Sequence, residues 1–233
     1  MEQQRIGICS MNKKILVVAA HADDEVLGCG GTIARHVEEG DHVNVVFMAD
    51  GVASRGADVS NALKRRNQAR DHALKILGVK AWRALDFPDN RMDSVPLLDV
   101  VKALEIIIDN WQPTRVYTHF CSDLNVDHRV THQAVMTACR PAPGISVREI
   151  LTFEVMSSTE WATPGIAPFE PNVFVDISDY LPKKLEALAA YEMEMRLSPH
   201  SRSIEHIEAL ARHRGSSVGL KAAESFVLIR SLI

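Results

Sequence analysis

Strand patterns and helix patterns alternate along residues 14–140. A run of apolar residues without polar interruption predicts a strand that is covered on both faces of a sheet. Apolar residues three or four positions apart predict a helix with one face in the core. The predicted strands are 14–20, 42–49, 81–85 and 115–120. The predicted helices are 26–40, 60–78, 96–111 and 127–139.

This alternation predicts an α/β fold with a mostly parallel central sheet that helices cover on both sides. Beyond Pro141 the pattern is less regular, and residues 141–233 are expected to extend the same domain. Two further strands and two further helices are predicted there, at 148–155, 172–177, 181–197 and 203–215. The whole chain, 1–233, is therefore predicted to be one domain with its core at 14–140, which suits a length of 233 residues.

Segments rich in acids, histidines and hydroxyl groups follow the four strands predicted in this core. In open α/β sheets, ligands bind outside the carboxyl ends of the strands, so these segments should meet at one edge of the sheet. They are HADDE (21–25), DGVASRG (50–56), DFPDNRMD (86–93) and THFCSDLNVDH (118–128). The sequence therefore predicts a functional site at this edge.

The acids that follow the first predicted strand need a positive partner. Asp23, Asp24 and Glu25 stand beside His21, and neighbouring carboxylates repel one another unless a cation lies among them. A second group follows the fourth predicted strand and contains the histidines His128 and His132. His21, one or two of the acids and one or two of the later histidines suit a divalent ion such as zinc. An acid that does not bind the metal would remain as a general base.

Each group alone has a simpler explanation. Acids in the first turn of a helix are favoured by the helix dipole, and a lone His128 is more often a surface or capping residue. The presence of both groups at strand ends weakens these explanations. Two histidines and a carboxylate also suit the iron site of oxygenases, although the α/β pattern is not the antiparallel barrel expected for that chemistry. A sugar-binding protein without catalytic activity is a further alternative.

Composition narrows the expected partners and compartment. The formal net charge is −4 and the pI about 6.2, so no basic field for nucleic acid is expected. The four cysteines form no C-x-x-C pair, which suits a reducing cytosol. Residues 1–14 contain no long apolar segment, and the longest apolar runs are short. We therefore expect no signal peptide, no transmembrane segment and a cytoplasmic location.

Two motifs together resemble those of the PIG-L/LmbE-type zinc-dependent N-deacetylases. They are AHADDEVLGCGGTIARH (20–36) and DLNVDHRVTHQAV (123–135). The hallmark of that family is His-Pro-Asp-Asp-Glu after the first strand, with a later Asp-His. The likeness covers most of the chain and includes RNQARDHALKILGV (66–79) and FPDNRMD (87–93). It implies a Rossmann-like three-layer fold and hydrolysis of an acetamide, commonly on molecules that carry N-acetylglucosamine.

The resemblance also implies roles for individual residues. By position, His21, Asp24 and His128 correspond to the metal ligands, and Asp23 corresponds to the general base. The residues implied to contact substrate are Arg66 and Asp89. The implied metal is Zn²⁺, and another divalent ion such as Fe²⁺ is the alternative.

The chain departs from the family pattern at two positions. Ala22 replaces the usual proline, which should change the rigidity of the turn more than the chemistry. Asn125 stands where several members carry a histidine that helps to stabilise the oxyanion or to donate a proton. Asn125 can donate a hydrogen bond but cannot deliver a proton at neutral pH, and Asp127 would lack the imidazole partner that those members provide. Both residues are still predicted to belong to the catalytic site, with His119 and His200 as alternative proton donors.

The sequence thus predicts a metal-dependent amidohydrolase that removes the N-acetyl group from a small molecule or glycan of N-acetylglucosamine type. A formyl group in place of the acetyl group, and a nucleotide-linked or lipid-linked amino sugar as the substrate, are the alternatives. Segments 156–161 and 199–203 are expected at the mouth of the site. A homo-oligomer is compatible with the sequence.

Overall fold

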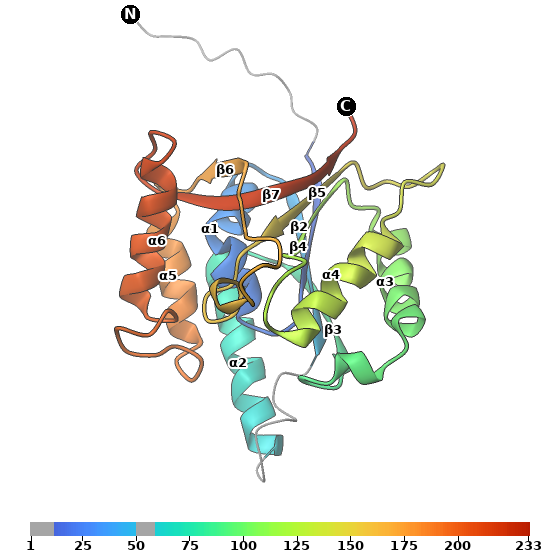
Figure 1. The fold of residues 1–233 in the computed structure, drawn as a ribbon, viewed down its shortest axis with the longest axis horizontal. Helices are drawn as coiled ribbons and strands as arrows, with labels where there is room; N and C mark the ends of the chain where they lie inside the picture. The colour runs from blue at the N-terminus through green and yellow to red at the C-terminus, as the bar shows by residue number, and fades with distance from the viewer. Residues whose placement is uncertain (1–11, 50–58) are drawn as a thin grey trace, which may run out of the picture.

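Helices cover both faces of one central sheet in the computed structural model, which describes residues 12–49 and 59–233 (Figure 1). The strands are β1 (Lys14–Ala19), β2 (His42–Ala49), β3 (Ala81–Phe87), β4 (Arg115–His119), β5 (Glu149–Phe153), β6 (Val173–Asp176) and β7 (Ala223–Ser231). The α-helices are α1 (Asp24–Glu38), α2 (Val59–Leu77), α3 (Leu97–Trp111), α4 (Val126–Ala138), α5 (Leu181–Ala190) and α6 (Ile204–Ser216). The short 3-10 helices are η1 (Met92–Ser94) and η2 (Thr159–Trp161). The segment 50–56, predicted to reach the site, lies outside the described residues.

The strands form a seven-stranded sheet in the order β3-β2-β1-β4-β5-β7-β6. Strands β1 to β5 pair in parallel, and β7 is antiparallel to both β5 and β6. The predicted α/β fold with a mostly parallel sheet is thereby confirmed. The chain builds from β1 to β3 on one side and then returns to place β4 on the other side of β1. Ligands bind at such a reversal of strand order in open α/β sheets.

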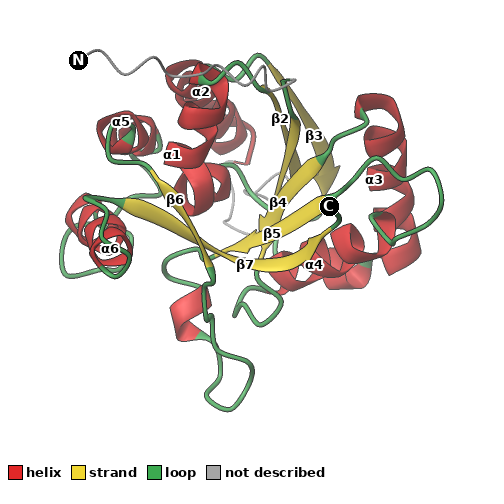
Figure 2. Ribbon diagram, turned by 90° about the horizontal axis from the view of Figure 1, so that it is seen from above, coloured by secondary structure: helices red, strands yellow, loops and turns green. Residues whose placement is uncertain are grey.

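Alternating side chains of β1 explain why its sequence is apolar throughout. Ile15, Val17 and Ala19 pack into a core shared with α1, α2 and α5. Leu16 and Val18 pack into a second core, shared with α3 and α4. Figure 2 shows α1, α2, α5 and α6 on one side of the sheet and α3 and α4 on the other. Because both faces of this strand are buried, its sequence contains apolar residues at consecutive positions and does not alternate between apolar and polar ones.

The helix predicted at 181–197 is shorter than expected. It ends at Ala190, and Tyr191 leaves helical geometry with φ −89° and ψ 43°. The hydroxyl group of Tyr191 donates a hydrogen bond to the buried carboxylate of Glu25 at 2.7 Å. Favourable helix propensity beyond Ala190 is thus overridden by a tertiary contact.

Strand β7 is absent from the sequence prediction. Glu224 and Ser225 interrupt its apolar pattern, although both are buried. Glu224 is buried because the Lys184 ammonium group donates a hydrogen bond to it. Strands β5, β7 and β6 continue the sheet formed by the earlier part of the chain.

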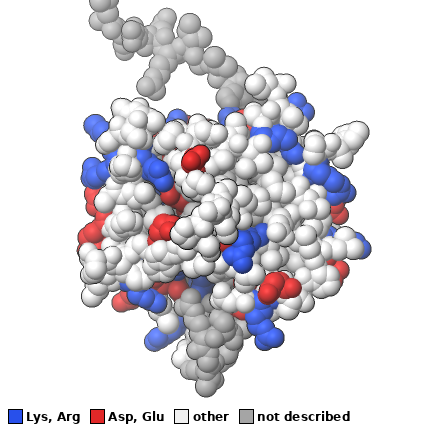
Figure 3. Space-filling view, viewed as in Figure 1, with Lys and Arg blue, Asp and Glu red and all other residues white. Residues whose placement is uncertain are grey.

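The visible face of the molecule carries Lys and Arg side chains interspersed with Asp and Glu side chains (Figure 3). Among the described residues, no helix combines the length and the apolar character that crossing a membrane requires.

Candidate metal centre and active site

Three buried side chains converge where the strand order reverses. His21 follows β1, Asp24 begins α1, and His128 lies in the first turn of α4. Asp24 Oδ2 lies 3.4 Å from His21 Nδ1 and 3.3 Å from His128 Nε2. One ligand atom from each residue lies within 4.8 Å of the other two. The structure thus brings together the three residues that the family resemblance implied as metal ligands.

The donor atoms of this group suit a divalent cation. Buried polar atoms in proteins nearly always have a hydrogen-bond partner, yet Asp24 Oδ1 and His128 Nε2 are buried without one. Burial alone would raise the pKa of Asp24, but His128 and His119 hold it well below its usual range. Two imidazole nitrogens and one carboxylate form a ligand set typical of catalytic zinc, which keeps a coordination position for water or substrate.

His21 is held by a second carboxylate. Its Nε2 lies 2.9 Å from Asp127 Oδ2, and Asp127 also accepts hydrogen bonds from the backbone N–H groups of Asn90 and Met92 at 2.6 and 3.0 Å. Burial raises the pKa of Asp127, but the lowering effect of His21 and these donors is larger. The pKa of Asp127 is therefore below its ordinary value. Asp127 therefore has an imidazole partner, although it comes from His21. Such outer carboxylates orient metal-binding imidazoles.

His128 lies within ion-pair distance of Asp123, a residue to which the sequence prediction assigned no role. Asp123 Oδ1 lies 3.1 Å from His128 Nδ1. Asp123 also accepts hydrogen bonds from the hydroxyl groups of Ser158 and Thr159. Burial raises the pKa of Asp123, but His128, His119 and the Ser158 hydroxyl group lower it to about 2. Segment 156–161 therefore reaches the site through these hydroxyl groups.

The three consecutive acids point to three different partners. Asp24 faces the histidines, as described above. Asp23 Oδ2 lies 2.9 Å from Arg202 Nη1, and its Oδ1 lies 3.4 Å from Arg66 Nη2. Glu25 accepts hydrogen bonds from the Tyr191 hydroxyl group and the Asp23 backbone N–H, and burial raises its pKa to about 7. This geometry separates Asp23 from Asp24, which the spacing of the residues could not do.

Asp23 also has an unusual backbone. Its φ of 125° lies in a region that side-chain-bearing residues rarely adopt and that costs free energy. Burial raises the pKa of its carboxyl group, against the lowering effect of Arg202 and Arg66. Asp23 is therefore a buried carboxylate next to Asp24 in the chain, and its two oxygens face Arg202 and Arg66.

Arg66 lies against Asp23 rather than on a solvated face of α2. Its side chain is only 6% exposed and donates hydrogen bonds to Ala22 O at 2.7 Å and to Glu194 Oε1 at 2.9 Å. By contrast, Arg65 is exposed, and the Arg70 guanidinium stacks 3.7 Å above the Trp82 ring. Arg66 is therefore a buried residue beside Asp23 and not a solvated surface charge.

Arg202 was not identified as a site residue from the sequence. It lies in segment 199–203, which was expected at the mouth of the site, but no local pattern distinguishes it from the other arginines. Its Nε donates to Met156 O, and its backbone N–H donates to His200 Nδ1 at 3.0 Å. His200 therefore supports the turn that carries Arg202.

The remaining predicted residues, Asp89 and Asn125, both contact Asn90. Asp89 Oδ1 is 3.4 Å from His21 Nε2 and accepts a hydrogen bond from Asn90 Nδ2 at 3.2 Å. Asn125 is the N-cap of α4: its Oδ1 accepts from the Asp127 N–H at 2.8 Å, and its Nδ2 donates to Asn90 Oδ1 at 3.3 Å. Both ends of the Asn125 amide therefore support the local structure.

Two further histidines have structural contacts. His119 is fully buried, stacks on His128 with ring centroids 3.9 Å apart, and accepts a hydrogen bond from the Ala20 N–H at 2.8 Å. Burial and the neighbouring His128 hold its pKa well below the usual value. His132 Nδ1 lies 2.9 Å from His119 O. These contacts favour a positioning role for His119 and leave His132 outside the group of candidate ligands.

Known proteins resemble this chain in sequence and in fold. Residues 16–139 match the family described as PIG-L: GlcNAc-PI de-N-acetylase. The protein named Uncharacterized deacetylase YaiS, from Escherichia coli K12, is 36% identical over 198 residues, which cover 82% of this chain and 97% of that protein. The crystal structure of the conserved protein TT1542 from Thermus thermophilus is similar with a TM-score of 0.75 and 27% identity, and the match covers 95% of this chain and 96% of that one.

Similar chains also include an enzyme with a different reaction. The 4-oxalmesaconate hydratase of Pseudomonas putida is 27% identical over 238 residues, which cover 94% of this chain and 88% of the hydratase. Similarity at this level therefore leaves the substrate open.

Proposed function

Because this chain belongs to the PIG-L family of deacetylases, we propose that it is a metal-dependent amidohydrolase that removes the acetyl group from an N-acetylglucosamine-type sugar or sugar conjugate. The observation that carries the proposal is the buried group of His21, Asp24 and His128, together with the buried carboxylate of Asp23, the residue that precedes Asp24. Hydrolysis of an amide needs both an electrophilic centre and a base, and this arrangement can supply both.

The proposed metal is zinc, with ferrous iron as the alternative. His21 Nδ1, an oxygen of Asp24 and His128 Nε2 would hold it, while Asp127 and Asp123 fix the two imidazole rings. When bound at such a site, zinc lowers the pKa of its water to about 7 and polarises a carbonyl group.

In the proposed reaction, Asp23 accepts a proton from the attacking water and later returns it to the leaving amine. Arg202 and Arg66 hold its carboxylate in place, so the base is oriented before the substrate arrives. We place Asp89 on the sugar hydroxyl groups and Asn125 at the edge of the site, where it caps α4 and accepts a hydrogen bond from the Asp127 N–H. Arg66 acts in this scheme through Asp23, because its guanidinium is buried against Asp23, Ala22 and Glu194.

A second candidate is the hydration of an unsaturated carboxylic acid, which the similarity to 4-oxalmesaconate hydratase favours. It needs the same activated water but releases no carboxylic acid. We rank it below deacetylation because the E. coli relative, at higher identity, is named a deacetylase.

The test is to load the purified protein with zinc and to measure acetate or formate released from N-acetylglucosamine, its N-formyl analogue and diacetylated chitobiose. His128→Ala, which removes one proposed ligand, is the control for activity from a contaminating enzyme. Release of acetate by the wild type but not by the control supports the proposal. Full zinc occupancy without release from any of the N-acyl sugars would contradict it, and turnover of 4-oxalmesaconate would then support the hydratase.

A further inference from the structure

Glu194 is buried beside Asp23 although it lies in the loop between α5 and α6. Its Oε1 accepts a hydrogen bond from Arg66 Nη1 at 2.9 Å, and its Oε2 lies 3.9 Å from Arg202 Nη1. Asp23 contacts the same two guanidinium groups through its own oxygens. Acidic and basic side chains therefore alternate in a cluster of Asp23, Arg66, Glu194 and Arg202.

The two carboxylates compete for Arg66. The guanidinium lies 2.9 Å from Glu194 but 3.4 Å from Asp23, and charge-assisted hydrogen bonds are normally about 2.7–2.9 Å long. Arg66 is thus closely bonded to Glu194 and only loosely bonded to Asp23. Its contact with Ala22 O at 2.7 Å keeps it near both carboxylates.

Burial of Glu194 is costly and indicates a role for its charge. A buried carboxylate must be compensated by partners, and Glu194 is 6% exposed. Among the described residues, a neutral residue at this position would leave Asp23 as the carboxylate that Arg66 and Arg202 share. Both would then bond closely to Asp23 and occupy the oxygens that a base needs for the proton it accepts.

We propose that Glu194 is a positioning residue for the reaction: it draws Arg66 away from Asp23 and keeps Oδ1 of Asp23 available to the attacking water. The proton passes from water to Asp23, and Glu194 itself takes no part in the transfer. This inference rests on the role of Asp23 in the proposed function.

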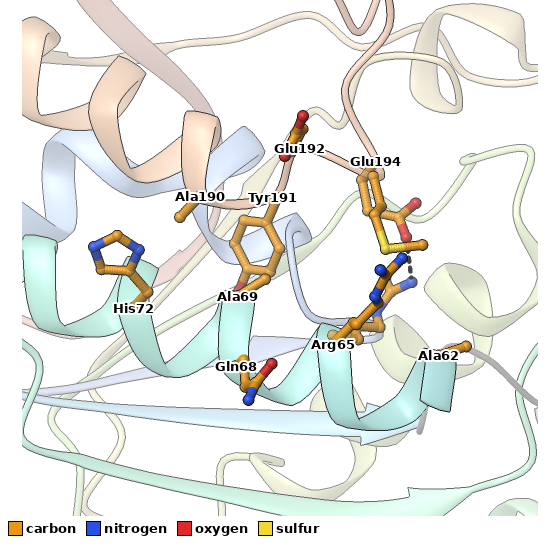
Figure 4. Close-up of a pocket in the computed structure, with 11 residues that line it drawn as sticks. Ala62, Arg65, Gln68, Ala69, His72, Ala190, Tyr191, Glu192 and Glu194 are labelled. Atoms are coloured by element: carbon orange, nitrogen blue, oxygen red, sulfur yellow. Dashed lines mark hydrogen bonds and ion pairs between the residues drawn. The ribbon is translucent and has the colours of Figure 1, made fainter. Parts of the chain in front are cut away.

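The chain offers a matched control. Glu192 lies two positions earlier in the same loop, is exposed, and lines the same pocket of about 780 Å³ between α2 and the end of α5. Figure 4 shows the ion pair of Glu194 as a dashed line, with Glu192 lying apart from it. A general effect of removing an acid from this loop would therefore appear in Glu192→Ala as well.

The first measurement is kcat, KM and zinc content of Glu194→Ala, Glu194→Gln and Glu192→Ala. We expect Glu194→Ala to lower kcat by about 10- to 100-fold, the effect of a slightly misplaced catalytic group, with little change in KM or zinc content. Glu194→Gln should recover part of the loss, because its amide oxygen still accepts a hydrogen bond from Arg66. Equal kcat per bound zinc in Glu194→Ala and Glu192→Ala would overturn the proposal.

The second measurement does not depend on activity. In a crystal structure of metal-free Glu194→Ala, the distance from Arg66 Nη2 to Asp23 Oδ1 should shorten from 3.4 Å to about 2.8 Å, and it should stay unchanged in Glu192→Ala. An unshortened distance overturns the proposal even if kcat falls.

If the wild type releases no acetate, the proposed function fails, while this distance still tests Glu194. Should Glu194→Ala not fold, Glu194→Gln carries both measurements, with a smaller fall in kcat of about 3- to 10-fold.

Discussion

Helix α1 meets two buried clusters of charge, and they differ in how completely the protein satisfies them. At its N-terminus, Asp24 faces the rings of His21 and His128, and Asp24 Oδ1 and His128 Nε2 remain without a hydrogen-bond partner. In its middle, Lys184 and Glu224 form an ion pair in which both charged groups are hydrogen-bonded.

The Lys184–Glu224 pair compensates for a break in helix α1. Cys29 has non-helical φ and ψ of −149° and 26°, which frees backbone groups on either side. Lys184 Nζ donates to Leu27 O at 2.9 Å, and Glu224 accepts from the N–H groups of Gly31 and Thr32 at 3.0 and 2.7 Å. The pair thus replaces hydrogen bonds that a continuous helix would make for itself.

The presence or absence of unsatisfied hydrogen-bonding atoms distinguishes a buried charge with a structural role from one that can bind a ligand. A buried ion pair whose hydrogen bonds are complete needs nothing more from outside the chain. A buried carboxylate among imidazoles with unpartnered atoms has capacity left for a ligand. Substitutions should therefore affect stability at the Lys184–Glu224 pair and metal binding at the Asp24 cluster.

The largest effect is expected from Asp24→Asn. Loss of the only carboxylate in the proposed ligand set should reduce zinc from about one ion per chain to near zero. It should also slow hydrolysis by more than about 10³-fold, since a metal supplies several kcal/mol of transition-state stabilisation. Elemental analysis and an acetate assay measure these effects, and chelation of the wild type should reproduce them. Retention of stoichiometric zinc would remove Asp24 from the ligand set.

Asp23→Asn should keep the zinc and lose the reaction. An amide cannot accept the proton of water, and a positioned base contributes about 10²–10⁴-fold. Zinc content and kcat measured on the same preparation separate this outcome from that of Asp24→Asn. If the variant hydrolysed at nearly the wild-type rate, the base would have to be another residue.

Lys184→Met tests the structural cluster. It leaves the buried Glu224 carboxylate without its cation, which should lower the free energy of unfolding by about 3–5 kcal/mol. Urea denaturation of the metal-free protein measures the loss. Addition of Glu224→Gln to the same chain should recover part of it, and zinc content per folded chain should stay unchanged. Loss of zinc with unchanged stability would reverse the assignment of the two clusters.

Arg66→Ala should lower kcat by about 10- to 100-fold, because Asp23 loses one of the two cations beside it and its carboxylate can shift. Arg65 lies one position earlier on α2 but is exposed, so Arg65→Ala should change kcat by less than about 2-fold. A rise in KM at constant kcat would show instead that Arg66 binds the substrate directly.

Asn125→Ala is expected to have the smallest effect. Removal of the N-cap of α4 should cost about 1 kcal/mol of stability, with a modest change in kcat. Thermal denaturation and steady-state kinetics measure the two effects together. A fall in kcat of about 10²–10³-fold without loss of stability would instead support Asn125 as the oxyanion donor.

The sequence predicted the parts of the molecule that depend on local patterns. Strands β1 to β4 and the helices between them follow from apolar periodicity, and the family match and the E. coli relative confirm the resemblance seen in the two motifs. The approach of the segments after β1 and β4 followed from the rule that ligands bind at carboxyl ends of strands.

The residues that the sequence did not reveal are those defined by distant contacts. Glu194 and Arg202 look like ordinary surface charges, because only the path of the chain after α5 brings them to Asp23. Likewise, β7 was hidden by Glu224, whose burial makes sense only with Lys184 in place. Local pattern cannot show which charges will meet in the folded chain.

The family match ends at residue 139, and this boundary divides the site. The proposed metal ligands all precede it, whereas Arg202 and Glu194, which surround Asp23, follow it. For protein engineering, the neighbours of the base that Arg202 and Glu194 supply can therefore be exchanged while Arg66 and the proposed metal ligands are kept. A chimera that takes residues 141–233 from a relative would keep every proposed ligand and inherit new neighbours for Asp23.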